Sequence, residues 1–245
     1  MSFFDFGTPE MGPVLAGLLI GWLFGGLGNL AADLLPAWGT ETWRRPIRHD
    51  LRHAWTLWWI LPTRGHCSVC GEQRSRRAPL LELAGIGVCG LLGWRFGADG
   101  SVLAVAWLYA GYLLAVLVID LETRRVLNVM TAPAALAALA CSFLPGTPTP
   151  LAALLGGALG LGIFLILALV SRGSLGMGDV KLAGVIGLMI GYPDVSATLI
   201  LGVLLGGVAA LYLLIVRRAG RKATMAYAPY LSLGALYSLF MFLGQ

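Results

Sequence analysis

Charged side chains are scarce in this sequence. Asp, Glu, Lys and Arg make up 12% of the 245 residues, whereas soluble domains carry about 25%. Hydrophobic residues make up 58%, and the mean hydropathy is +0.82. A water-soluble globular fold is excluded, because too few charges are present to cover its surface. The composition predicts a polytopic membrane protein that contacts the lipid bilayer, and the net charge of +5 does not call for a nucleic-acid partner.

Basic residues are missing from the start of the chain. Asp5 and Glu10 are the charged residues among the first ten, which include no Lys or Arg. A cleaved secretory signal needs a basic stretch ahead of its apolar run. We therefore expect the first hydrophobic segment to be retained as a membrane helix.

Cysteines are few, and they are of two kinds. Cys89 and Cys141 stand singly in apolar segments, where we expect small buried hydrophobic side chains. Cys67 and Cys70 form a Cys-x-x-Cys pair in a polar loop. Of the four cysteines, only Cys67 and Cys70 suggest a functional site.

Hydrophobic runs dominate the rest of the chain. Several are near the ~20 residues that a helix needs to span a bilayer. They predict an all-α, polytopic membrane helical bundle of about eight transmembrane helices, with a cytoplasmic loop after the first helix. The sixth run is short, which suits a partial or tilted span. The runs cover residues 11–32, 80–96, 102–121, 129–144, 152–170, 180–192, 196–216 and 227–243.

Basic residues in the loops test this layout. If the chain crosses eight times, 16 of the 17 Lys and Arg residues fall on one side, and Arg95 alone falls on the other. The positive-inside rule then places the basic loops in the cytoplasm and both termini outside.

Two acidic residues stand at the ends of runs that this layout brings to one face. Asp120 closes the third run where it leaves for the cytoplasm, and Asp179 opens the sixth run where it enters. Acidic residues in membrane segments are costly to place and often mark a functional site. Gly176 and Gly178 precede Asp179. We expect these glycines to adopt backbone angles closed to other residues and to let a substrate backbone approach.

Neighbouring carboxylates are suited to acid–base hydrolysis. They cannot easily both ionise, so they share a proton. The ionised member can accept a proton from water while the protonated member polarises a carbonyl. The alternative is structural: both are helix-end residues near basic partners such as Arg124 or Lys181, and Asp179 caps its helix.

Six motifs in order resemble those of the type IV prepilin peptidases, a leader peptidase and N-methyltransferase family of Gly-x-Gly-Asp intramembrane aspartyl proteases. Together they extend along most of the chain, and a series of six is far more specific than any one of them. They are Gly21–Asn29, Arg64–Cys70, Arg77–Leu83, Asp120–Asn128, Gly176–Leu182 and Ala228–Ala235.

The resemblance implies an aspartic endopeptidase with Asp120 and Asp179 as its catalytic pair. Its substrates would be type IV prepilins or pseudopilins, cleaved at the cytoplasmic face of the prokaryotic inner membrane. Proteolysis of this kind needs no cofactor. Many members also N-methylate the new N-terminus with S-adenosylmethionine, and Gly65 matches a glycine implicated in that activity. The implied parts are a first transmembrane helix (1–32), a cytoplasmic loop (33–79) and a membrane-embedded peptidase core (80–245).

The cytoplasmic loop departs from the family pattern. Many bacterial members carry two Cys-x-x-Cys pairs, whereas only Cys67 and Cys70 are present here. His49 and His53 are four residues apart and would complete a Cys2His2 set, which zinc accepts in tetrahedral geometry. The alternative is that the metal has been lost and these side chains are solvated. The loss of one pair also bears on methyl transfer.

Two other functions compete with the peptidase. A small ion-coupled transporter could use Asp120 and Asp179 as its coupling pair, although the sequence shows no inverted repeat. A catalytically inactive assembly scaffold is the third hypothesis. Glu82, at the start of the second run, either places a favourable charge at a helix N-terminus or orients the loop or the substrate.

Overall fold

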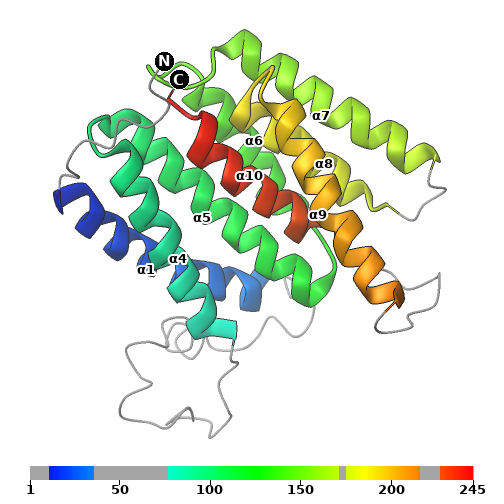
Figure 1. The fold of residues 1–245 in the computed structure, drawn as a ribbon, viewed down its shortest axis with the longest axis horizontal. Coiled ribbons are helices and arrows are strands. Elements are labelled where there is room, and N and C mark those ends of the chain that lie inside the picture. Colours follow the sequence, from blue (N-terminus) through cyan, green and yellow to red (C-terminus); the bar gives the residue numbers. More distant parts are fainter. Residues whose placement is uncertain (1–10, 36–76, 171–174, 216–226, 245) are drawn as a thin grey trace, which may run out of the picture. The chain divides into compact units, whose positions relative to one another are not determined.

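The structure is a computed structural model, and it describes residues 11–35, 77–170, 175–215 and 227–244. Figure 1 shows the helices of this part in chain order. They are α1 (Met11–Leu34), α4 (Arg77–Phe96), α5 (Gly100–Thr123), α6 (Asn128–Cys141), α7 (Pro150–Val170), α8 (Met177–Ile190), α9 (Val195–Ile215) and α10 (Ala228–Phe242).

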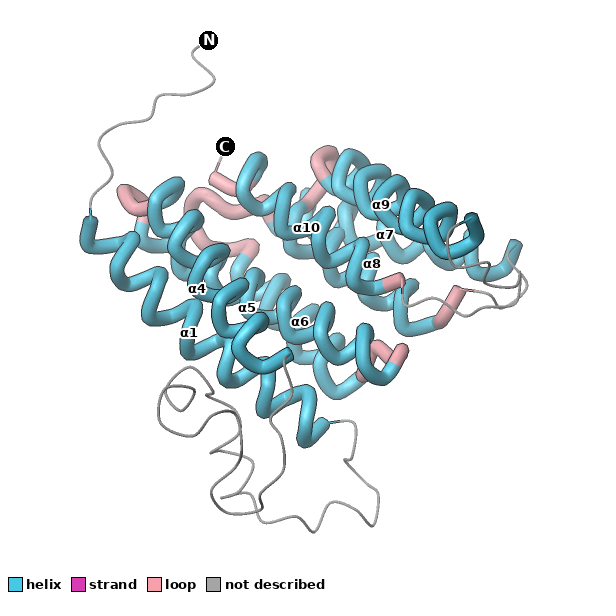
Figure 2. Tube along the Cα trace, turned by 60° about the horizontal axis from the view of Figure 1, so that its bottom comes forward, coloured by secondary structure: helices cyan, strands magenta, loops and turns pink. Residues whose placement is uncertain are grey.

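Each predicted hydrophobic run is one of these helices, with ends that differ by no more than three residues. Helices and turns alone make up the described part of the chain (Figure 2), so the all-α prediction is confirmed. By length and composition, α1, α4, α5, α7 and α9 can each cross a membrane. The helices α6, α8 and α10 are shorter, with 14, 14 and 15 residues. The protein is therefore a multi-pass membrane protein.

Contacts divide the chain into two compact units, Met1–Gly111 and Tyr112–Gln245. The boundary falls within α5, which contributes its first half to one unit and its second half to the other. The predicted division at residue 80 concerns membrane topology, and it stays a prediction.

In the first unit, α1 and α4 run antiparallel and side by side (Figure 1). Their backbones approach closely where glycines face each other. A Cβ atom on Gly21 would overlap the carbonyl oxygen of Gly85, and one on Gly85 would overlap that of Gly21. Small residues let membrane helices pack in this way, because nothing separates the two backbones. Trp107 of α5 joins the pair by donating to the carbonyl of Cys89 (2.9 Å).

The start of α5 explains why the chain turns sharply after α4. Asp99 caps the helix, since its carboxylate accepts from the backbone N–H groups of Ser101 and Val102, each at 3.2 Å, and from the Ser101 hydroxyl at 2.8 Å. These hydrogen bonds hold the pKa of Asp99 below its usual value, and the bond from the Ser101 hydroxyl has the largest effect.

In the second unit, α8 is the buried helix. Leu182, Ala183 and Ile186 are fully buried. Its glycines meet those of α7, since a Cβ on Gly187 would lie against the backbone of Gly156. Gly191 ends the helix with φ +79°, a conformation that glycine adopts without strain. The helix α8, whose first turn carries Asp179, packs against α6, α7 and α10.

Candidate active site

Asp120 lies in the last turn of α5, where the apolar part of the helix ends. Its side chain is only 3% exposed. Among the described residues, its Oδ2 atom is buried and has no hydrogen-bond partner. A buried carboxylate oxygen without a partner is costly in free energy, and such groups deserve a functional explanation.

Asp179 lies in the first turn of α8, three residues after the N-cap residue Gly176. Its carboxylate reaches back to the backbone N–H of Gly176, as an acidic residue at this position does in a capping box. The N-cap residue is Gly176 and not Asp179, and no side-chain cap hydrogen bond is formed at this end of α8. The carboxylate nevertheless lies beside the helix N-terminus.

The reason for Gly176 and Gly178 differs from the predicted one. Gly176 has φ −72° and ψ 142°, which any residue can adopt, and Gly178 is helical. The prediction of backbone angles closed to other residues is therefore wrong. Both glycines instead leave room: a Cβ on Gly176 would lie 3.3 Å from Oδ2 of Asp179, and one on Gly178 would lie 2.9 Å from Cβ of Val126.

The structure brings Asp120 and Asp179 together at the start of α10. The backbone N–H of Ala228 is near enough to both carboxylates to favour their charged forms, and the charge of Asp120 acts on Asp179. Ala228 is the first residue of α10, so its N–H has no partner within the helix. Pro229 follows and has no N–H to satisfy. The positive end of the α10 dipole thus faces the acidic pair.

Two further side chains complete the site. The Arg124 guanidinium attracts the carboxylate of Asp120, as the structural alternative anticipated. Lys181 does not pair with Asp179 but donates to Oδ1 of Asn128 at 2.8 Å. Arg124 itself has φ 53°, which is uncommon for a residue with a side chain.

Sequence reasoning missed Tyr227, which precedes α10. Burial raises the pKa of its phenol, and the negative charge of Asp179 raises it further. Its ring packs against Phe164 of α7, with 6.1 Å between centroids, and fills the space beside Gly206 of α9. Its place directly before the Ala228–Ala235 motif was the available signal.

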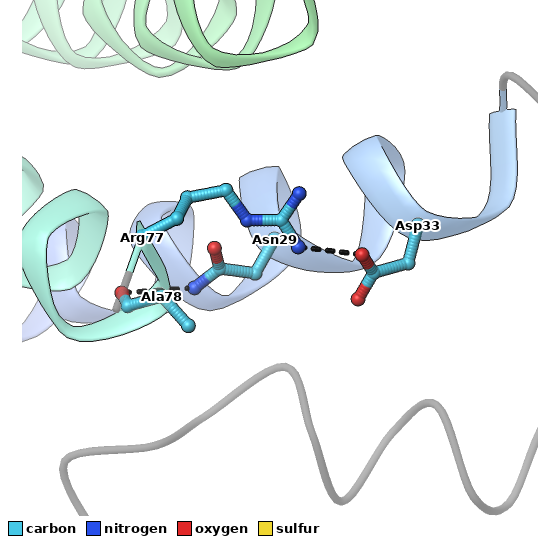
Figure 3. Close-up of polar contacts among 4 residues, drawn as sticks. All are labelled: Asn29, Asp33, Arg77 and Ala78. Atoms are coloured by element: carbon cyan, nitrogen blue, oxygen red, sulfur yellow. Dashed lines mark hydrogen bonds and ion pairs between the residues drawn. The ribbon is translucent and has the colours of Figure 1, made fainter. Parts of the chain in front are cut away.

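A second polar cluster lies in the first unit, at the end of α1 and the start of α4. Arg77 pairs with Asp33 (2.5 Å), and the Asn29 side chain donates to the carbonyl of Ala78 at 3.1 Å (Figure 3). These bonds tie together the two helix ends that flank residues 36–76.

Glu82 lies deeper in the same helix pair. It is fully buried and accepts from Nε1 of Trp22 at 2.9 Å. It belongs to the second turn of α4 rather than to its N-terminus. The expectation of a favourable charge at the helix N-terminus is therefore wrong, and a role in orienting the loop or substrate stays a prediction.

The predicted metal and methyl-transfer residues Gly65, Cys67, Cys70, His49 and His53 lie outside the described residues. Within the described part, no group of three His, Cys, Asp or Glu side chains is arranged to hold a metal ion.

The fold and this site define a class of protein. A membrane helical bundle that places a buried and a half-buried carboxylate side by side near a helix N-terminus has the groups needed for acid–base hydrolysis in a partly dry site. One carboxylate can accept a proton while the other donates one. Because the two are coupled, neither role belongs to a single residue.

Comparison with known proteins points to the same class of protein, one equipped for hydrolysis. The profile of the type IV leader peptidase family matches residues 107–211, which include both aspartates. A relative from Burkholderia pseudomallei is 31% identical over 223 residues, covering 86% of this chain and 71% of the relative. One from Pseudomonas aeruginosa is 25% identical over 263 residues, covering 92% of this chain and 89% of the relative.

A relative from Pseudomonas putida is 30% identical over 179 residues, and the match spans 62% of its length. All three relatives are named prepilin leader peptidase/N-methyltransferase. No solved structure matches the chain. The chain belongs to the type IV leader peptidase family, a family of aspartic peptidases. The resemblance seen in the six motifs is thereby confirmed.

Proposed function

We propose that this chain cleaves the leader peptide from type IV prepilins or pseudopilins at the cytoplasmic face of the prokaryotic inner membrane. Asp120 and Asp179 are its catalytic pair. The observation that carries the proposal is their convergence: two carboxylates 59 positions apart in the sequence face the same backbone N–H, that of Ala228. Membership of the leader peptidase family favours this function over an ion-coupled transporter.

The chemistry follows from one proton held between two carboxylates. The ionised aspartate accepts a proton from a water molecule as the water oxygen attacks the scissile carbonyl. The protonated aspartate donates to the carbonyl oxygen, and a tetrahedral intermediate forms. Its collapse breaks the C–N bond, and the amine leaves with a proton from the pair. No covalent bond forms between enzyme and substrate.

The surroundings suit this reaction. Burial of Asp120 strengthens each electrostatic contact, because little water screens it. The N–H of Ala228, at the N-terminus of α10, stabilises the negative charge of the pair. Half-buried Asp179 and exposed Gly176 leave one side of the site open, where an extended substrate backbone can approach. The cut falls after a glycine that precedes the mature hydrophobic helix.

The test is cleavage of a prepilin by detergent-purified protein, with Asp120→Asn and Asp179→Asn compared with the natural sequence. General acid–base catalysis contributes roughly 10²–10⁴-fold, so each variant should lose at least that much activity. Asp194→Asn is the matched control. Asp194 lies past the far end of α8, about 20 Å along the helix from Asp179, and should leave cleavage unchanged. Cleavage that survives in either pair variant rejects the dyad.

A second activity is favoured by the relatives' shared name. The chain transfers a methyl group from S-adenosylmethionine to the amine that cleavage exposes. When bound, S-adenosylmethionine would supply the methyl group from its positively charged sulfur, and the amine that receives it would release a proton. Gly65 is the candidate residue for this step. Adding labelled methyl donor to the cleavage assay measures it directly, and unlabelled product from a cleaving enzyme rejects it.

A further inference from the structure

The segment that follows Asp120 is fastened to the helix that carries Asp179. Lys181 Nζ donates to Asn128 Oδ1 at 2.8 Å, across 53 positions of sequence. Gly178 contacts Val126 so closely that an added Cβ would lie 2.9 Å from the Val126 Cβ. Both contacts join the region between α5 and α6 to the first two turns of α8.

The connection between α5 and α6 needs such contacts. The chain leaves α5 through Arg124, whose φ of 53° breaks the helix and redirects the backbone. Leu127, the N-cap residue of α6, is extended and has no side-chain capping bond. The connection has no cap of its own here, and Val126 within it packs against Gly178 in the first turn of α8.

These contacts act on the two aspartates from both sides. Asp120 is four residues before Arg124, on the helix whose end the connection holds. Gly178 directly precedes Asp179, and Lys181 follows it by two positions. A movement of the connection relative to α8 changes the spacing between the carboxylates, because each is rigidly attached to one of the two parts.

We propose that the Lys181–Asn128 hydrogen bond and the Gly178–Val126 contact form a clasp that sets the spacing of the catalytic carboxylates. Lys181 and Asn128 are then positioning residues, since they act through Asp179 and Asp120. The inference rests on the proposed function of that pair. It explains why a polar contact on the surface joins the two aspartate motifs.

A positioning role of the clasp can be distinguished experimentally from an ordinary contribution to stability. Both Lys181 and Asn128 are exposed, and an exposed polar contact contributes little to stability. A merely structural contact would therefore change neither stability nor rate by much. A clasp changes the rate strongly and the stability weakly, because misplacement of catalytic groups by about 1 Å can cost about 100-fold.

The spacing of the two carboxylates also affects how the cleavage rate depends on pH. A pair that shares one proton is active between the loss of the first proton and the loss of the second, so its rate follows a bell-shaped curve. Carboxylates that move apart interact less, and the two limbs of the curve approach each other. The other groups that face the pair are Arg124 at Asp120 and Tyr227 at Asp179. Neither is altered by changes at Lys181 or Asn128.

The experiment is a double-mutant cycle on the full chain, with prepilin cleavage as the readout. Lys181→Met and Asn128→Leu should each lower kcat by about 10- to 100-fold, leave KM unchanged and narrow the pH profile. The double variant should be no worse than either single one. Asn128→Asp keeps the acceptor for Lys181 and should retain activity.

Arg125→Met is the matched control, because it removes an exposed positive charge from the same connection. It should leave kcat and the pH profile unchanged. Equal kcat values and equal profiles for Lys181→Met and Arg125→Met overturn the clasp, and so do additive losses in the cycle. If Asp120→Asn still cleaves, the catalytic pair on which the clasp rests is rejected. If that variant is inactive while Lys181→Met is fully active, only the clasp fails.

The contact between Gly178 and Val126 can be tested independently by enlarging the first residue and reducing the second. Gly178→Ala should lower kcat, because its Cβ displaces Val126. Combining it with Val126→Gly removes the colliding Cβ and should restore part of the lost rate. A double variant that is slower than Gly178→Ala contradicts the proposal.

Discussion

The contact between α7 and α8 supports a quantitative prediction from two glycines on one helix. Gly156 and Gly162 both belong to α7, and both would gain a methyl group on substitution by alanine. At Gly156 the new Cβ would overlap the carbonyl oxygen of Gly187, and it would lie 2.8 Å from the carbonyl carbon of Gly191. At Gly162 nothing lies within 4 Å. The same chemical change should therefore have opposite effects.

The magnitude follows from these distances. Ordinary van der Waals contact begins at 3.4 Å, so the backbones at Gly156 must part by more than 0.6 Å, the difference between 3.4 and 2.8 Å, because the carbonyl oxygen of Gly187 lies closer still. The atoms in the way belong to the backbone and cannot rotate aside. Overpacking of this kind costs about 1–3 kcal/mol. Alanine gains up to about 1 kcal/mol of helix propensity over glycine at both positions, so that gain cancels in the comparison.

The assay is thermal denaturation of the two purified variants in the same detergent. Gly156→Ala should be less stable than Gly162→Ala by about 1–3 kcal/mol. At about 2–4 °C for each kcal/mol, its midpoint should lie roughly 2–12 °C lower. Gly162→Ala should equal or exceed the natural sequence. Equal midpoints for the two variants would refute the inference that the α7–α8 contact is close-packed.

Two further predictions concern the first unit and the loop. Trp22→Phe removes the hydrogen bond to buried Glu82, and it should lower the free energy of unfolding by about 1–3 kcal/mol in the same denaturation assay; an unchanged midpoint contradicts this. If Cys67, Cys70 and the loop histidines bind zinc, purified protein should contain close to one zinc per chain. Its removal by a chelator should leave cleavage intact, because the aspartate pair needs no metal; metal analysis that finds none rejects the zinc site.

Much of the site could be anticipated from the sequence because it lies at the ends of hydrophobic runs. The length and order of those runs indicated eight helices, and the side of each loop followed from its basic residues. That layout alone brought Asp120 and Asp179 to one face of the membrane. The predicted alternative was also partly right, since Arg124 does attract Asp120.

Errors arose where the answer depends on how two helices are packed. Lys181 was expected near Asp179 because the two are close in sequence, yet it reaches Asn128 on α6. Gly178 was expected to allow backbone angles closed to other residues, yet it is helical and makes room for Val126. Glu82 was expected near a helix N-terminus, yet it is buried against Trp22.

The sequence by itself determined that this chain is a membrane helical bundle with two acidic residues at helix ends. The reason is that insertion into a bilayer depends on the length of hydrophobic runs and the placement of charges, which are local properties of the sequence. Only the tertiary structure decided which groups surround those acids. The shared N–H of Ala228, the ring of Tyr227 and the contact of Gly178 with Val126 depend on the relative rotation and depth of helices far apart in the chain. Close packing of one helix backbone against another sets this rotation and depth, and no local sequence pattern predicts them.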